Sequence, residues 1–127
     1  MTKKFLTVLD VRPHGDYEGG RSRWYLANPL VFQSKIAGLT LTVPEGFVTD
    51  FASVPRLPIV YLTMNDIGHP AAVVHDYLYR NGMFDRRLCD KIFEEALKDL
   101  GVSLVVRKLM WAAVRVGGFV SYQDRKV

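Results

Sequence analysis

The segment HPAAVVHDYLYR places His75 and Asp76 side by side in an apolar run that has helical spacing. His75 falls near the centre of the apolar face, and Tyr79, four residues later, lies on the same side of the helix. A second helix must return roughly antiparallel after a short turn, which brings Asp90 back towards His75 and Tyr79. An imidazole whose tautomer is fixed by a carboxylate can act as a general base, so these residues predict proton-transfer chemistry.

Asp76 is predicted to turn away from the centre of the apolar face, where its carboxylate is available for a cation. Hard metals such as calcium prefer carboxylate and carbonyl oxygens. Asp50 is a second candidate metal ligand, because the stretch VTDFASVPR places it where a strand gives way to a proline-limited loop. Two other roles are open for Asp50, as an ion-pair partner of Arg56 and as a cap for local backbone groups.

A structural interpretation of the histidine is also open. A single histidine on an apolar face is more often a core residue whose ring nitrogens are hydrogen-bonded, and Asp90 would then be only its partner. Spacing alone favours this interpretation of His75 over the catalytic one.

The elements that must position these residues change type half-way along the chain. Short β-type runs occupy the first half, and the stretch RPHGDYEGGRS between two of them is rich in turn-forming residues. The predicted strands are residues 5–9, 24–26, 30–32, 39–43 and 47–49. They indicate a small, mostly antiparallel sheet.

Helical spacing begins at about residue 70. Pro70 suits the first turn of one helix and Gly82 suits its end. Asp85 is the predicted N-cap of a second helix, which ends at Gly101. A third helix is predicted over about residues 103–116, ending at the glycine pair 117–118.

The resulting fold class is α+β, with the sheet first and three helices after it. One domain is predicted over residues 1–127, with the sheet in about 4–50, a connecting loop in about 50–69 and the helices in about 70–118. Hydrophobic residues make up 49% and charged residues 24% of the chain, which is typical of a globular protein. Cys89 is the only cysteine, so neither a disulfide framework nor a cysteine-based zinc cluster can form.

The charge pattern bears on partners and location. The formal net charge is +4, but the basic residues stand in short, separate groups along the sequence. This pattern favours solubilising surface charge over nucleic-acid binding. No signal peptide is recognised and no window approaches the length of a membrane span, so we expect a soluble protein that is made in the cytoplasm.

Three motifs in order, VPEGFVTDFASVPR, HPAAVVHDYLYR and RRLCDKIFEEALKDLGV, resemble the phage and prophage family called domain of unknown function 1353. The resemblance spans about residues 39–118. It implies a phage or prophage origin, with synthesis in the host cytoplasm. A place in the virion, among other virion proteins, is consistent with that origin.

The string HDYLY also resembles the active-site helix of phospholipases of the A-two type, including the virion-borne domain of parvoviruses. In those enzymes the histidine activates water, the adjacent aspartate holds calcium, and a later aspartate orients the histidine. The resemblance implies these roles for His75, Asp76 and Asp90, with Tyr79 bonded to Asp90. The glycine-rich calcium loop of those enzymes has only residues 65–68 in the corresponding place.

Two functions therefore follow from the sequence. The first is a hydrolase-like site, with calcium as a candidate cofactor and ester bonds in lipid or a cell-envelope component as candidate substrates. The second is a non-catalytic tail or capsid accessory protein, in which the pair formed by His75 and Asp90 only locks two helices together.

Overall fold

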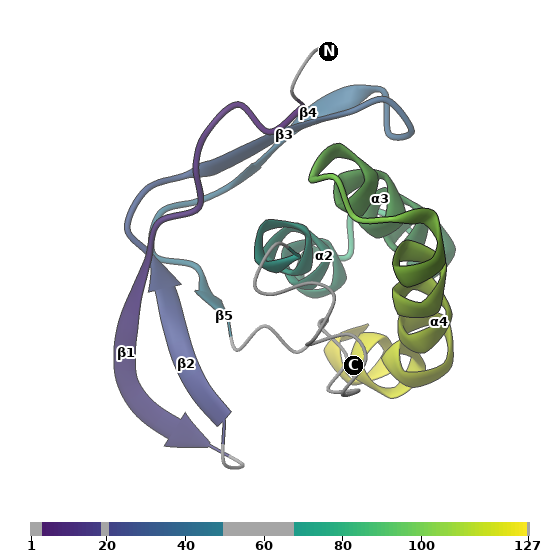
Figure 1. Ribbon diagram of the computed structural model, residues 1–127. Coiled ribbons are helices and arrows are strands. Elements are labelled where there is room, and N and C mark those ends of the chain that lie inside the picture. The colour runs from purple at the N-terminus through teal and green to yellow at the C-terminus, as the bar shows by residue number, and fades with distance from the viewer. Residues whose placement is uncertain (1–3, 19–20, 50–67, 127) are drawn as a thin grey trace.

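The computed structural model describes residues 4–18, 21–49 and 68–126. Its strands curve along one side of the molecule, and three helices pack on the concave side of these strands (Figure 1). This arrangement confirms the predicted α+β class, with antiparallel strands in the N-terminal half and three helices after them.

The strands are divided between two sheets rather than one. All pairings are antiparallel among the described residues, and the sheet orders are β1-β2-β5 and β3-β4. The strands are β1 (Val11–Glu18), β2 (Arg21–Leu26), β3 (Leu30–Ser34), β4 (Leu39–Val43) and β5 (Val48–Thr49). Four of the five predicted strands are thus present, with limits close to those expected.

The hairpin of β3 and β4 forms one wall of the core. Leu30 and Phe32 alternate with more exposed residues along β3, and Leu41 and Val43 do the same along β4. Gly38 has a φ of 72° in the connecting turn, a backbone conformation that glycine adopts without a steric penalty. The period of two therefore directs one face of this hairpin onto the helices.

The prediction of a strand over residues 5–9 is wrong, because these residues form no strand of that length. Phe5 forms only an isolated bridge with Phe32, because Thr7 replaces the ladder with side-chain hydrogen bonds. The Thr7 hydroxyl donates to the carbonyl of Pro29 at 3.0 Å and accepts from the amide of Val31 at 2.9 Å.

The turn-rich interpretation of RPHGDYEGGRS is also wrong. Most of this stretch belongs to β1 and β2, which pair as an antiparallel hairpin. The register shifts between Pro13 and Tyr17, so the proline and Gly15 lie at a bulge on an edge strand. Proline and glycine are tolerated at such positions, and for this reason they misled a prediction based on local composition.

The first two helices begin and end as predicted. Their bounds are α2 (His69–Asn81) and α3 (Arg86–Asp99). Pro70 lies in the first turn of α2, and Gly82 ends this helix with a left-handed φ of 70°. The Asp85 carboxylate caps α3 by accepting a hydrogen bond from the amide of Leu88 at 2.8 Å.

The third helix, α4 (Leu104–Lys126), extends beyond its predicted end. It continues through Gly117-Gly118, because glycine lowers helix stability by only about 1 kcal/mol per residue and keeps its backbone N–H. No helix in the described part of the chain has an apolar stretch long enough to cross a bilayer.

The central element is α2, which contacts β3 and β4 on one side and α3 and α4 on the other (Figure 1). Contact on both sides explains why this helix is buried around most of its circumference. Its fully buried apolar residues are Ala71, Ala72, Val73, Val74 and Leu78. The helix that carries the HDYLY string therefore lies in the core rather than on the surface.

Candidate functional site

Three of the predicted site residues meet in the core. Asp90 Oδ1 lies 2.6 Å from His75 Nε2, and the Tyr79 hydroxyl donates to the same oxygen at 2.5 Å. All three side chains are buried: His75 is 1% exposed, Tyr79 is 4% exposed and Asp90 is 0% exposed. The predicted contact between the two helices is confirmed.

Local signals between the helices produce this contact. The left-handed Gly82 reverses the chain after α2, and the carboxamide of Asn81 accepts a hydrogen bond from the amide of Met83 at 3.0 Å. The Asp85 cap then starts α3 within three residues of the reversal. Such a short connection makes the two helices antiparallel neighbours, so Asp90 in the second turn of α3 faces His75.

The second carboxylate oxygen of Asp90 binds cations that the sequence analysis did not single out. Arg115 of α4 donates to Oδ2 at 2.9 Å, and Arg86 lies 3.8 Å from the same oxygen. Arg86 also donates to the carbonyl of Arg115 at 2.8 Å. The spacing of four residues between Arg86 and Asp90 was available in the sequence, whereas no local pattern indicates Arg115.

These contacts set the protonation of the acid and the phenol. Burial raises the pKa of Asp90, but hydrogen bonds from His75 and Tyr79 outweigh it, and the net shift is downward. Burial and the adjacent Asp90 raise the pKa of Tyr79 above its usual range. At neutral pH Asp90 is therefore a carboxylate that accepts hydrogen bonds, and Tyr79 is a neutral phenol that donates one to it.

Aromatic rings fix the orientation of the imidazole. Its ring centroid lies 4.1 Å from that of Tyr79 and 4.8 Å from that of Phe93. Since Asp90 accepts at Nε2, a neutral His75 carries its proton on that nitrogen, and Nδ1 is then the basic nitrogen. The contacts therefore fix the orientation and the tautomer of a buried imidazole.

Asp76, the predicted metal ligand next to His75, is buried and lies beside a cationic side chain. The residue is only 4% exposed, because α2 is covered on both sides, and its Oδ2 lies 3.5 Å from a terminal nitrogen of Arg80. Within the described residues no group of three or more His, Cys, Asp or Glu side chains could hold a metal ion. Asp50, the other predicted ligand, lies outside the described residues.

Arg80 joins this part of α2 to the end of β5. It donates to the carbonyl of Val48 at 2.6 Å, and its guanidinium lies 4.9 Å from the centre of the Phe47 ring. Tyr77 packs edge-on against Phe47, with ring centroids 5.5 Å apart. The strand that leads to Asp50 in the sequence is thus attached to the turn of α2 that begins with Asp76.

Comparison with protein families gives one match, over residues 24–114, to a family described as a protein of unknown function, DUF1353. The chain belongs to the DUF1353 family. The match includes His75, Asp76, Tyr79 and Asp90 and stops one residue before Arg115. No curated protein and no solved structure matches this DUF1353 protein.

Proposed function

We propose that this DUF1353 protein is a phage- or prophage-encoded ester hydrolase in which His75 is the general base. One observation carries the proposal, the shared contact of His75 Nε2 and the Tyr79 hydroxyl with Asp90 Oδ1. In the phospholipases that the HDYLY string resembles, a histidine and a tyrosine likewise contact one aspartate. Asp90 orients the imidazole, and Tyr79 holds Asp90.

The proposed reaction begins with proton transfer from a water molecule to His75 Nδ1. The water oxygen forms a bond to the ester carbonyl carbon, whose double-bond electrons move to the carbonyl oxygen. As the carbonyl re-forms, the bond to the alcohol oxygen breaks, and the leaving oxygen takes the proton from Nδ1. The Asp90 carboxylate stabilises the imidazolium that exists between the two proton transfers.

Calcium is not required for these steps as written. A calcium ion takes six to eight oxygen ligands, whereas no group of three or more His, Cys, Asp or Glu side chains among the described residues could hold a metal, Asp76 included. That carboxylate is already paired with Arg80. A calcium role would therefore depend on further ligands, of which Asp50 is the predicted one.

The substrate class and location rest on the resemblances. We propose ester bonds in lipid or in a cell-envelope component as substrates, synthesis in the host cytoplasm, and action either there or from the virion. A virion-mounted enzyme would have other virion proteins as partners.

The test compares hydrolysis by the wild type, His75→Gln and Asp76→Asn on mixed phospholipids and on generic esters, with and without calcium. His14→Gln is the matched control, because it makes the same change at an exposed position on β1. We expect turnover by the wild type and the control, and its loss in His75→Gln. Turnover that persists in His75→Gln would contradict the proposal, as would a wild type without activity on any of these substrates.

A second function is favoured by a different observation. Asp90 is fully buried and its two oxygens join α2, α3 and α4 through His75, Tyr79 and Arg115. In a non-catalytic virion accessory protein this network would serve only to lock the helices. An inactive wild type combined with a large drop in the melting temperature of His75→Gln would support this second function.

A further inference from the structure

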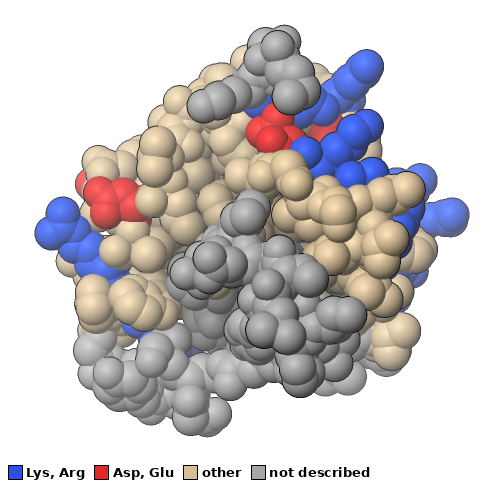
Figure 2. Space-filling model, viewed as in Figure 1, with Lys and Arg blue, Asp and Glu red and all other residues tan. Residues whose placement is uncertain are grey.

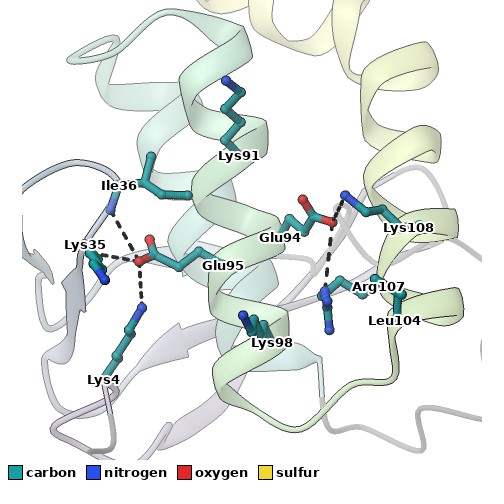
Figure 3. A pocket seen from close by; sticks show the side chains of 10 residues that line it. All are labelled: Lys4, Lys35, Ile36, Lys91, Glu94, Glu95, Lys98, Leu104, Arg107 and Lys108. Carbon is teal, nitrogen blue, oxygen red and sulfur yellow. Dashed lines mark hydrogen bonds and ion pairs between the residues drawn. The ribbon is translucent and has the colours of Figure 1, made fainter.

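A pocket of about 330 Å³ lies against α3, and none of its lining residues belongs to the Asp90 network. Its floor is the outward face of α3, on which Lys91, Glu94, Glu95 and Lys98 have the spacing of helical neighbours. One wall is formed by Lys4 and the β3–β4 turn, and the other by the first turns of α4 (Figure 3).

The pocket contains six cationic side chains against two carboxylates. The cations are Lys4, Lys35, Lys91, Lys98, Arg107 and Lys108. Their excess of four positive charges equals the formal net charge of the whole chain, +4, so the rest of the chain is formally neutral. On the face drawn in Figure 2, the Lys and Arg atoms gather mainly on the side of α3 and α4.

Both carboxylates are already engaged by the protein. Glu95 accepts from the Lys4 ammonium at 2.9 Å, from the Ser34 hydroxyl at 2.7 Å and from the amide of Lys35 at 2.7 Å. Burial raises the pKa of Glu95, but these hydrogen bonds outweigh it and lower the pKa, so the group stays ionised. Glu94 Oε2 lies 2.7 Å from the Lys108 ammonium. Neither acid therefore neutralises the remaining lysines.

The ammonium groups of three lysines in the pocket form no contact that stabilises the described part of the fold. Among the described residues, the ammonium groups of Lys35, Lys91 and Lys98 have no hydrogen-bond or ion-pair partner. Lys91 and Lys98 are two turns apart on α3, about 10 Å along the axis, so a single small anion cannot lie directly over both. The charges suit an elongated anion that carries several negative groups.

We propose that this pocket binds a small anion with a chain of phosphate groups, either inorganic triphosphate or the triphosphate of a nucleotide. Each ammonium is a compact charge with three donors, which suits phosphate oxygens. The volume is at the lower end of that of small-molecule sites, which favours a compact ligand. Ile36 and Leu104 are partly exposed at the two walls and offer an apolar contact to a nucleoside.

The test measures binding by calorimetry at low ionic strength, with inorganic phosphate, inorganic triphosphate, ATP and a short DNA duplex as probes. The double variant Lys35→Gln/Lys98→Gln removes two of the unpaired charges. Arg12→Gln/Arg87→Gln is the matched control, since it removes two exposed charges outside the pocket. All four substitutions are at exposed positions, and melting temperatures will show whether each variant is folded.

We expect triphosphate to bind more tightly than phosphate, and its affinity to fall at least about tenfold in Lys35→Gln/Lys98→Gln but not in the control. Equal affinity for triphosphate and ATP assigns recognition to the phosphate chain alone, and tighter binding of ATP adds a nucleoside contact. Absence of binding, an equal loss in the control, or DNA binding with which triphosphate does not compete would overturn the proposal.

Discussion

Two carboxylates on α3, five residues apart, join this helix to opposite parts of the molecule. Asp90 binds α2 and α4 through the side chains of His75, Tyr79 and Arg115. Glu95 instead binds β3 and the residues that follow it, together with Lys4 of the N-terminal segment. Both acids have lowered pKa values, because in each case hydrogen bonds outweigh burial.

The partners of the two acids differ in what they can do. Glu95 accepts from the backbone amides of Lys35 and Ile36 and from the Ser34 hydroxyl, groups that fix a turn and do not titrate near neutral pH. Asp90 contacts an imidazole, whose unperturbed titration lies near neutral pH. A buried acid can thus be structural or serve proton transfer, and the proposed function assigns the second role to Asp90.

The largest effect is expected from Asp90→Ala. The change leaves Arg86 and Arg115 without their carboxylate and the Tyr79 hydroxyl without its acceptor. We expect a loss of about 3–5 kcal/mol in the free energy of unfolding, measured by urea denaturation. Glu94→Ala is the control on the same helix, because it removes only the partly exposed ion pairs with Arg107 and Lys108 and should cost about 1 kcal/mol. Similar losses in both variants would show that Asp90 does not hold the helices together.

A smaller effect is expected from Glu95→Gln. The variant keeps the size of the side chain but weakens the charge-assisted bonds from Lys4, Ser34 and Lys35. We expect a loss of about 2–3 kcal/mol in the free energy of unfolding and no change in hydrolysis. Reduced hydrolysis at normal stability would remove the functional distinction between the two acids.

The residues around Asp90 were predictable because the signals that place them are local. Gly82 ends one helix, Asp85 begins the next, and the spacing of His75 and Tyr79 sets their common side. Arg115 was not predictable, since its position depends on how α4 packs across α3.

Features that depend on distant pairing were missed or misjudged. Strand β1 contains Pro13 and Gly15, which locally indicate a turn but lie at a bulge in a hairpin. Asp76 was expected to be available for a cation, and no local pattern shows that the residue is buried. The cationic pocket draws on residues from 4 to 108, so it forms no basic run in the sequence.

Acid should weaken both carboxylate networks. Each folded-state pKa is lowered, so each acid contributes stability that is present above its unfolded pKa, near 4, and is lost as the pH falls towards the folded pKa. We expect the free energy of unfolding to fall below about pH 4, by up to about 1.4 kcal/mol per pH unit for each group. Urea denaturation at several pH values across this range should show that the free energy of unfolding of Glu95→Gln depends less steeply on pH than that of the wild type. An unchanged slope would mean that Glu95 does not contribute.

The smallest effect concerns Cys89, which borders Asp90 and is fully buried. Burial and the nearby Asp90 raise the pKa of its thiol from 9.0 to about 12. The thiol therefore contributes stability that is present below pH 9.0 and is lost as the pH rises towards 12. At about pH 9.5 the free energy of unfolding of the wild type, measured by urea denaturation, should have fallen from its value at neutral pH by roughly 1 kcal/mol more than that of Cys89→Ala. Equal losses in the two proteins would indicate that the interior beside Asp90 is open to water.

The protonation of His75 can be measured without knowledge of the substrate. Nitrogen chemical shifts of the imidazole, assigned by comparison with His75→Gln, report which ring nitrogen carries a proton. If His75 is a general base oriented by Asp90, Nε2 should carry a proton at about pH 7 and Nδ1 should not. A proton on Nδ1, or on both nitrogens, would contradict the proposed role of His75.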